Sequence, residues 1–294
     1  MTSTVLRSPA SATASATALV NEPDTEVVTR ILAQINVVRN EPATCTKYFQ
    51  FKLPKPPTLE TIAKKIDGPK FRSMLRVSID SEHLRIKMHM PGSTHGRAAG
   101  LGHFILDAGK ALDNTFMRHL FASTNGGRSP HFDFTTSTMI LPEQRHGNYR
   151  KQPGWSAYPV ARPSKMPSIV IEVGVSENMN DLRDDARQWL NNFGPQVLTV
   201  VLMKIHPETQ TPSSDVTVEI WNRNPTTSAP RRARGPWTYY QTPNIPPNIP
   251  PAANLILHAT DLFLPIDMPP FMAGQQIDIQ GADIQFWVDQ VLGD

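Results

Sequence analysis

The sequence predicts an α/β fold, and two observations lead to that class. The segment Ile169-Val170-Ile171-Glu172-Val173 is almost continuously β-branched, which is typical of a strand buried on both faces. It is followed by an amphipathic segment over 180–192 and by a second apolar run over 197–203. A strand, a helix and a strand joined by short links indicate a β–α–β crossover, which puts both strands in one sheet.

Length and composition limit the possible kinds of protein further. A chain of 294 residues has room for one large domain with appendages or for two small ones. The net charge of +3 and the pI near 9.0 suit a polyanionic partner but do not require one. The single cysteine, Cys45, excludes an internal disulfide framework and a cysteine-rich zinc site. No apolar run reaches the roughly eighteen residues that span a bilayer. We therefore expect an intracellular protein of the cytoplasm or nucleus, with no membrane partner and no disulfide-linked partner.

The N-terminal part of the chain is expected to lie outside the core. Residues 1–22 are rich in Ser, Thr and Ala and contain one basic residue, Arg7, so we expect a disordered tail rather than a transit peptide. Residues 23–70 are expected to form a helical extension and a linker. Apolar residues over 24–39 recur on one helical face, and Pro-Lys-Pro-Pro at 54–57 then interrupts the chain.

An antiparallel hairpin is predicted near the start of the core. The runs Leu75–Ile79 and Leu84–Met90 both alternate between apolar and polar residues, and Asp80-Ser81-Glu82 connects them. Such alternation buries one face of the hairpin. Apolar residues at helical spacing follow over 101–112, and a further strand is predicted over 132–141, between two prolines.

The expected core covers 71–221 and contains the buried strand, the helix after it and two further strands. Leu182, Ala186 and Trp189 share one face of the helix, and Gly194-Pro195 ends it. After the apolar strand over 197–203, alternation predicts another strand at 216–221.

The C-terminal part is expected to return to the core after a break. Residues 222–252 are rich in proline and predict a loop or linker. Within them, Arg231-Arg232-Ala233-Arg234 and Trp237 combine cations with an aromatic ring, as single-strand nucleic-acid binders do, but we favour a solvated loop. Residues 253–294 predict a strand and then a terminal helix over 277–292 that pack on the core.

Glu172 is the first candidate for a functional residue. A carboxylate within a buried strand is costly unless it is paired, protonated or bound to a metal. Strand periodicity directs Val170, Glu172 and Gly174 to one face. Two interpretations stay open: Glu172 is a metal ligand, or it lies near the strand's end and pairs with Arg183 or Arg187 on the following helix.

Four segments of the sequence follow one another in an order that is similar to that of a known protein family. They are Met88-His89-Met90-Pro91-Gly92-Ser93-Thr94-His95-Gly96, Pro167-Ser168-Ile169-Val170-Ile171-Glu172-Val173-Gly174-Val175-Ser176-Glu177, the helix Leu182–Trp189 and the strand Val197–Met203. Over roughly 72–221 their order resembles the restriction-endonuclease group of the PD-(D/E)XK nuclease superfamily, including its eukaryotic relatives. The resemblance implies a restriction-endonuclease-like mixed β-sheet that is flanked by helices and preceded by a hairpin.

The resemblance also implies a chemistry. In that family an aspartate and a glutamate on adjacent strands hold a divalent ion, and a lysine two residues beyond the glutamate assists it. It therefore implies a Mg²⁺- or Mn²⁺-dependent endonuclease that acts on nucleic-acid phosphodiesters, in DNA rather than RNA. Glu172 takes the position of the glutamate. Glycine stands at the other two positions, Gly174 for the lysine and Gly154 for the aspartate.

Other residues are candidates to replace the family's aspartate and lysine. Asp133, on the preceding predicted strand, is either a second metal ligand or a solvated carboxylate at a strand end. Arg183 and Arg187 are candidates for the cation that stabilises the transition state. The competing hypothesis is a non-catalytic module of the same fold that binds nucleic acid or protein, with Glu172 in a structural ion pair.

Overall fold

The structure is a computed structural model that describes most of the C-terminal half of the chain and selected strands before it. The described residues are 26, 29, 31, 33, 47–52, 76–80, 85–90, 132–135, 150–175, 177–206, 215–242, 245 and 251–292. The tail over 1–22 and the helix predicted over 101–112 lie outside them. The four described positions between 26 and 33 are helical. No helix in the described ranges is long and apolar enough to cross a membrane.

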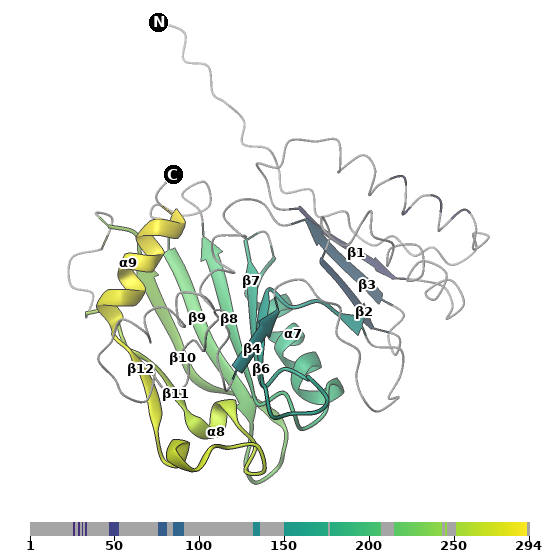
Figure 1. The fold of residues 1–294 in the computed structure, drawn as a ribbon. Coiled ribbons are helices and arrows are strands. Elements are labelled where there is room, and N and C mark those ends of the chain that lie inside the picture. Colours follow the sequence, from purple (N-terminus) through teal and green to yellow (C-terminus); the bar gives the residue numbers. More distant parts are fainter. Residues whose placement is uncertain are drawn as a thin grey trace, which may run out of the picture.

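A six-stranded mixed sheet forms the centre of the described chain (Figure 1). Its strand order is β10-β9-β8-β7-β6-β4, and only β7 and β8 are parallel to each other. Helix α7 (Met179–Asn192) connects those two strands, which confirms the predicted crossover and the α/β class. The strands are β4 (Phe132–Thr135), β6 (Trp155–Pro159), β7 (Ile169–Gly174), β8 (Thr199–His206), β9 (Asp215–Arg223) and β10 (Pro230–Tyr240).

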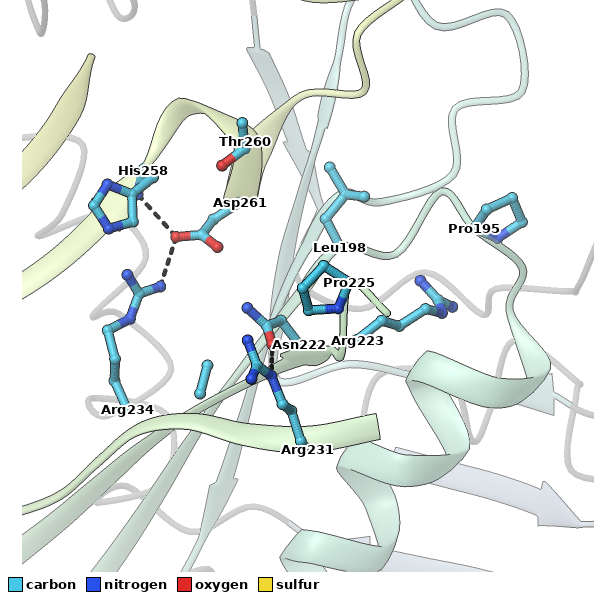
Figure 2. A pocket seen from close by; sticks show the side chains of 11 residues that line it. Pro195, Leu198, Asn222, Arg223, Pro225, Arg231, Arg234, His258, Thr260 and Asp261 are labelled. Carbon is cyan, nitrogen blue, oxygen red and sulfur yellow. Dashed lines mark hydrogen bonds and ion pairs between the residues drawn. The ribbon is translucent and has the colours of Figure 1, made fainter. Parts of the chain in front are cut away.

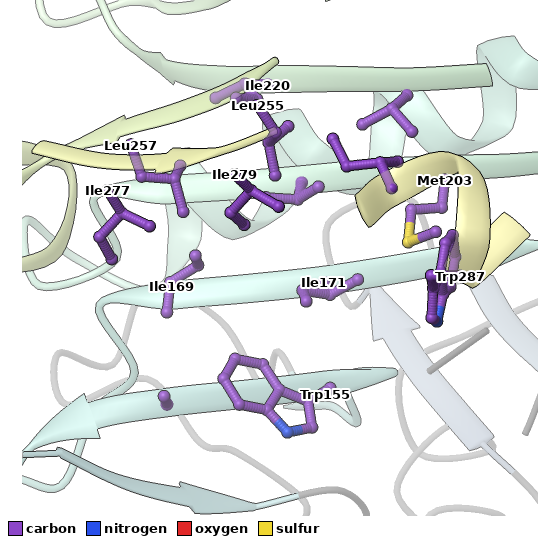
Figure 3. Packing of buried hydrophobic residues seen from close by; sticks show 14 of the residues in the cluster. Trp155, Ile169, Ile171, Met203, Ile220, Leu255, Leu257, Ile277, Ile279 and Trp287 are labelled. Atoms are coloured by element: carbon purple, nitrogen blue, oxygen red, sulfur yellow. The ribbon is translucent and has the colours of Figure 1, made fainter. Parts of the chain in front are cut away.

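Strand β7 is buried on both faces, as its Ile/Val run predicts. Val170 packs toward α7, in a cluster with Leu182 and Trp189. Ile169 and Ile171 face the other way, into a larger cluster that also contains residues of the C-terminal elements (Figure 3). Complete burial of one such side chain contributes about 1.5–3 kcal/mol, so the two clusters hold a three-layered arrangement together.

The C-terminal elements form the layer opposite α7 (Figure 1). They are β11 (Leu255–His258), α8 (Ala259–Leu262), the 3-10 turn Pro270–Met272, β12 (Gln276–Ile279) and α9 (Gly281–Leu292). Strands β11 and β12 pair in an antiparallel ribbon, in which Leu257 lies opposite Ile277. The helix predicted over 277–292 therefore begins later than expected, because its first residues complete this ribbon.

A second sheet of four strands carries the predicted hairpin. Its order is β1-β3-β2-β5, and Ile79 of β2 lies opposite Ile86 of β3, with both side chains buried. The hairpin prediction is confirmed, while β1 was not predicted. Three residues, 152–154, take the chain from β5 into β6 of the larger sheet. The strands are β1 (Lys47–Lys52), β2 (Arg76–Asp80), β3 (Arg85–Met90) and β5 (Arg150–Lys151).

The prediction of a loop or linker over 222–252 is wrong for its first half. Strand β10 occupies 230–240 and forms one edge of the six-stranded sheet. Edge strands tolerate proline because the missing N–H faces no partner. Here Pro230 begins the strand, and Pro236 lies where the register with β9 shifts between Arg234 and Trp237. The prolines therefore mark the edge of a sheet rather than a break in it.

Candidate functional site

The Glu172 side chain is enclosed between β7 and α7 and only 5% of the residue's surface is exposed. Trp189 donates its indole N–H to Glu172 Oε1 at 2.5 Å. Lys151 Nζ lies 3.8 Å from the same oxygen. Glu172 shares a face with Val170, as strand periodicity predicts, and that face is covered by α7. Its described partners are a lysine and a tryptophan rather than Arg183 or Arg187.

Lys151 links Glu172 to a second carboxylate, Asp185 of α7. Asp185 Oδ1 lies 2.8 Å from Lys151 Nζ and 2.9 Å from Lys87 Nζ. Asp185 and Trp189 are four residues apart on the helix, so both project toward β7 from the same face. With Glu177, which is also buried, these charged residues form what we call the lysine–carboxylate cluster: Lys87, Lys151, Glu172, Glu177 and Asp185.

Burial and charge act differently on Asp185 and Glu177, two carboxylates of the cluster. Burial raises the pKa of Asp185, but the nearby ammonium groups of Lys151 and Lys87 outweigh it and lower the pKa to about 2. Burial, followed by the charges of Asp185 and Glu172, raises the pKa of Glu177 to about 8. At neutral pH the cluster therefore holds an ionised Asp185 between two lysines and a protonated Glu177.

Gly174, at the position where the resemblance expects lysine, lies against α7. A Cβ atom there would come within 2.8 Å of a Leu182 methyl carbon, so glycine permits the close approach of the helix. The residue opposite Gly174 on β8 is Lys204, which is buried and donates to the carbonyl oxygens of Val175 at 2.5 Å and Ile205 at 3.1 Å. Burial lowers the pKa of Lys204 to about 8, although Glu177 and Asp215 oppose that shift.

The described donor set does not fit a divalent metal ion. Mg²⁺ requires near-octahedral coordination by oxygen, and several ligands must converge on one point. Among the described residues, no group of three or more His, Cys, Asp or Glu side chains is arranged to do so. The ammonium groups of Lys87 and Lys151 both contact Asp185 Oδ1, and Lys151 also lies beside Glu172. The positive charge in this cluster is therefore supplied by lysine.

Asp133 lies far from Glu172 along and across the sheet. Its backbone is on β4, opposite Tyr158 of β6, whereas the pairing of Trp155 with Ile171 puts Gly154 level with Glu172. Tyr158 and Gly154 are four positions apart, or about 13 Å along the strand, and β4 and β7 are two strand spacings apart, or about 9.5 Å. The register does not bring Asp133 and Glu172 to a common metal.

The two candidate arginines have other partners. Arg183 donates to Glu219 of β9, with Nη2 at 2.6 Å from Oε1 and Nε at 3.2 Å from Oε2. Arg187 pairs with Asp184 at 2.5 Å on the exposed side of α7 and lies over the Trp221 ring, 5.2 Å from its centre. Neither arginine has a described contact with Glu172. Both lie on the α7 side of the large sheet.

Glu219 is a fully buried carboxylate that sequence reasoning missed. Besides Arg183, it accepts hydrogen bonds from Trp221 at 2.8 Å and Arg232 at 3.2 Å. Burial raises the pKa of Glu219, but these hydrogen bonds outweigh it and hold the pKa below its ordinary range. Alternation over 216–221 assigns Glu219 to the polar positions of the strand, so no local signal in the sequence indicated its burial.

Arginines are concentrated on β9 and β10 without acidic neighbours in sequence. Between Glu219 and Asp261 the chain contains no Asp or Glu and four arginines. Three of them, Arg231, Arg232 and Arg234, lie on the edge strand β10, where Arg231 and Arg232 are exposed. We call these three residues the β10 arginines. They lie at the edge of the sheet farthest from β4, where Arg232 pairs with Glu219, Arg234 pairs with Asp261, and Arg231 has no carboxylate partner among the described residues.

Comparison with known proteins adds no family to this geometry: no protein-family model matches the sequence, and no curated protein or solved structure matches it significantly.

Proposed function

We propose that this protein is a non-catalytic nucleic-acid-binding module, which contacts the phosphate backbone through the β10 arginines. The observation that carries the proposal is the exposure of Arg231 and Arg232 on an edge strand, within a stretch that has no acidic residue. Guanidinium groups recognise phosphate through charge and paired hydrogen bonds, and such contacts provide most sequence-independent affinity for nucleic acid.

The carboxylates favour binding over cleavage. A nuclease of the resembled family needs its glutamate and aspartate free to hold Mg²⁺ or Mn²⁺. Here Glu172 accepts from Trp189 beside Lys151, and the register keeps Asp133, the candidate second ligand, away from Glu172. We infer that the lysine–carboxylate cluster stabilises the fold, with Glu172 in the structural role that the competing hypothesis gives it.

The binding proposal is tested by fluorescence anisotropy with labelled single-stranded DNA and RNA oligonucleotides over a range of salt concentrations. Arg231→Gln and Arg232→Gln are each expected to weaken binding several-fold. Each is also expected to reduce the slope of log K against log salt by about 0.7, the value for one phosphate contact to a single strand. Lys165→Gln removes one exposed positive charge from the turn between β6 and β7 and is the charge-matched control. Equal losses in all three variants would contradict a surface centred on β10.

Cleavage is tested on the same oligonucleotides with Mg²⁺ or Mn²⁺ present. Wild type and Glu172→Gln are expected to give the same background, since glutamine keeps an acceptor for Trp189. Metal-dependent cleavage by wild type that Glu172→Gln abolishes, with folding unchanged by circular dichroism, would favour the nuclease over the binding module.

A further inference from the structure

A pocket of about 540 Å³ opens beside the β10 arginines, on the side of the sheet opposite α7 (Figure 2). It lies at the end of β8 remote from Lys204, because Leu198 immediately before β8 contributes to its wall. None of the five residues of the lysine–carboxylate cluster lines the pocket, so the two are separate features. The volume is within the range of pockets that hold small organic ligands.

A β-bulge directs two of the β10 arginines into this pocket. Arg232 lies opposite Trp221, and Arg234 lies opposite the next residue of β9, Ile220, so Ala233 is the extra residue of the bulge. In a regular strand Arg231 and Arg234 would point to opposite faces. The bulge turns both toward the pocket, while Arg232 faces the α7 side and contacts Glu219. Figure 2 shows both side chains leaving the same side of the strand, Arg234 toward Asp261 and Arg231 toward Asn222.

The hydrogen-bonding groups around the pocket are only partly used. Arg231 Nε donates to Asn222 at 3.3 Å. Arg234 Nη2 lies 2.5 Å from Asp261 Oδ2, whereas its buried Nε has no hydrogen-bond partner among the described residues. Arg231 is exposed, so its terminal nitrogens are open to a ligand, whereas the buried Nε of Arg234 is not. The exposed side chains of His258 and Thr260 line the opposite wall.

The charge of the pocket is positive. Its lining includes three arginines and one carboxylate, Asp261. The third arginine, Arg223, donates to the carbonyl oxygens of Leu190, Gly194 and Val197, and Figure 2 shows it directed away from Arg234. Carbonyl partners do not neutralise its charge, so Arg223 adds to the positive potential without contacting a ligand.

We infer that this pocket binds the phosphate group of a nucleotide, with Arg231 and Arg234 as its ligands. Two guanidinium groups on one face match the several acceptor oxygens of a phosphate monoester. The volume leaves room for the attached sugar and base beside Leu198 and Pro225. The choice of a nucleotide rests on the proposed function, whereas the phosphate is derived from the pocket itself. The nucleotide is either free or the 5′-terminal residue of a strand.

The test compares ligands that differ only in phosphate. Isothermal titration calorimetry measures a nucleoside monophosphate against its nucleoside, and anisotropy measures a 5′-phosphorylated oligonucleotide against its 5′-hydroxyl form. Tighter binding of the monophosphate alone identifies a site for free nucleotides, and tighter binding of the phosphorylated strand alone identifies a site for a terminus. Either supports the inference. Wild-type protein that does not distinguish the phosphorylated member of either pair overturns it.

A matched pair of variants locates the site. Thr260→Glu introduces a negative charge into the pocket at an exposed position, and Thr260→Gln introduces a neutral side chain of nearly the same shape. We expect Thr260→Glu to lose about tenfold in affinity for the phosphorylated ligand relative to Thr260→Gln, because one charge at close range contributes about that much. Equal affinities in the two variants would overturn the assignment to this pocket.

Different results would reject the phosphate pocket and the proposed nucleic-acid-binding function. Arg232→Gln alters the β10 edge but not the pocket, so it is expected to weaken oligonucleotide binding and leave monophosphate binding unchanged. Monophosphate binding without any oligonucleotide binding would reject the proposed function alone. The opposite result is oligonucleotide binding that depends on Arg232 and yet is unchanged by 5′-phosphorylation and by Thr260→Glu. That result would reject only the assignment of the phosphate site to this pocket.

Discussion

Glu177 couples the stability of the protein to pH. Burial, with the charges of Asp185 and Glu172, raises its pKa from 4.5 to about 8 in the folded chain. Between these two values the folded state binds more protons than the unfolded state. The free energy of unfolding therefore falls as the pH rises through this window. Asp185 and Lys204 act outside it, since their pKa values shift between 3.8 and about 2 and between 10.5 and about 8.

Replacing Glu177 by glutamine is expected to remove this pH dependence. Wild type should lose stability relative to Glu177→Gln between pH 5 and pH 7.5, by about 2–4 kcal/mol across the window. Urea unfolding at intervals of half a pH unit measures the difference. The window excludes the ranges in which Asp185 and Lys204 change protonation. Parallel stability curves for the two proteins would show that Glu177 does not hold a proton in the folded state.

The partners of single residues were the hardest feature to predict. The cost of burying Glu172 could be recognised from five residues of sequence, and so could the face that it shares with Val170 and Gly174. Its neighbours could not, because Lys87 and Asp185 are 98 residues apart and meet only where two sheets dock. Local spacing suggested Arg183 and Arg187, which instead pair with Glu219 and with Asp184.

Helices and strands whose pattern of apolar residues lies within one short segment were predicted correctly. Helix α7 and the β2–β3 hairpin each follow one hydrophobic period, and β7 is a continuous apolar run, so local sequence is enough to identify all three. Strand β10 was missed because its prolines and arginines resemble a loop, and only its position at an edge makes them compatible with a sheet. The bulge at Ala233 was likewise hidden, since it depends on the register with β9.

The packing of α7 on β7 makes Gly174 sensitive to substitution. A Cβ atom at this position would approach a Leu182 methyl carbon to 2.8 Å. We expect Gly174→Val to lower the free energy of unfolding by about 1–3 kcal/mol, and Gly174→Ala by less, because the helix has little room to move away. Chemical denaturation measures both. In a Leu182→Ala background the colliding methyl groups are absent, and the penalty should largely disappear. A penalty unchanged by Leu182→Ala would show that the glycine serves a purpose other than helix packing.

At the scale of the whole molecule, the lysine–carboxylate cluster joins the two sheets. Lys87 and Lys151 belong to the four-stranded sheet, whereas Asp185 belongs to the helix that covers the larger one. Ion pairs also link the layers of the larger sheet, as between Arg183 and Glu219, and the lysine–carboxylate cluster is the charged contact toward the smaller sheet. Such a contact is directional, and it sets the orientation of the smaller sheet where apolar packing alone would allow several.

Asp185→Asn should therefore loosen one part of the protein more than the rest. The substitution keeps the shape of the side chain and leaves Lys87 and Lys151 without their shared carboxylate, a loss of about 3–5 kcal/mol for a buried pair. We expect amide hydrogen exchange to accelerate in β2, β3 and β5 while the amides of β7 and β8 remain protected, because those strands rely on the apolar clusters. Leu190→Ala is the comparison, since it removes apolar contacts of the same helix without touching the cluster. It should weaken the α7 side of the larger sheet first. Uniform acceleration in every strand of Asp185→Asn would mean that the two sheets unfold as one unit, and that the cluster stabilises the molecule as a whole.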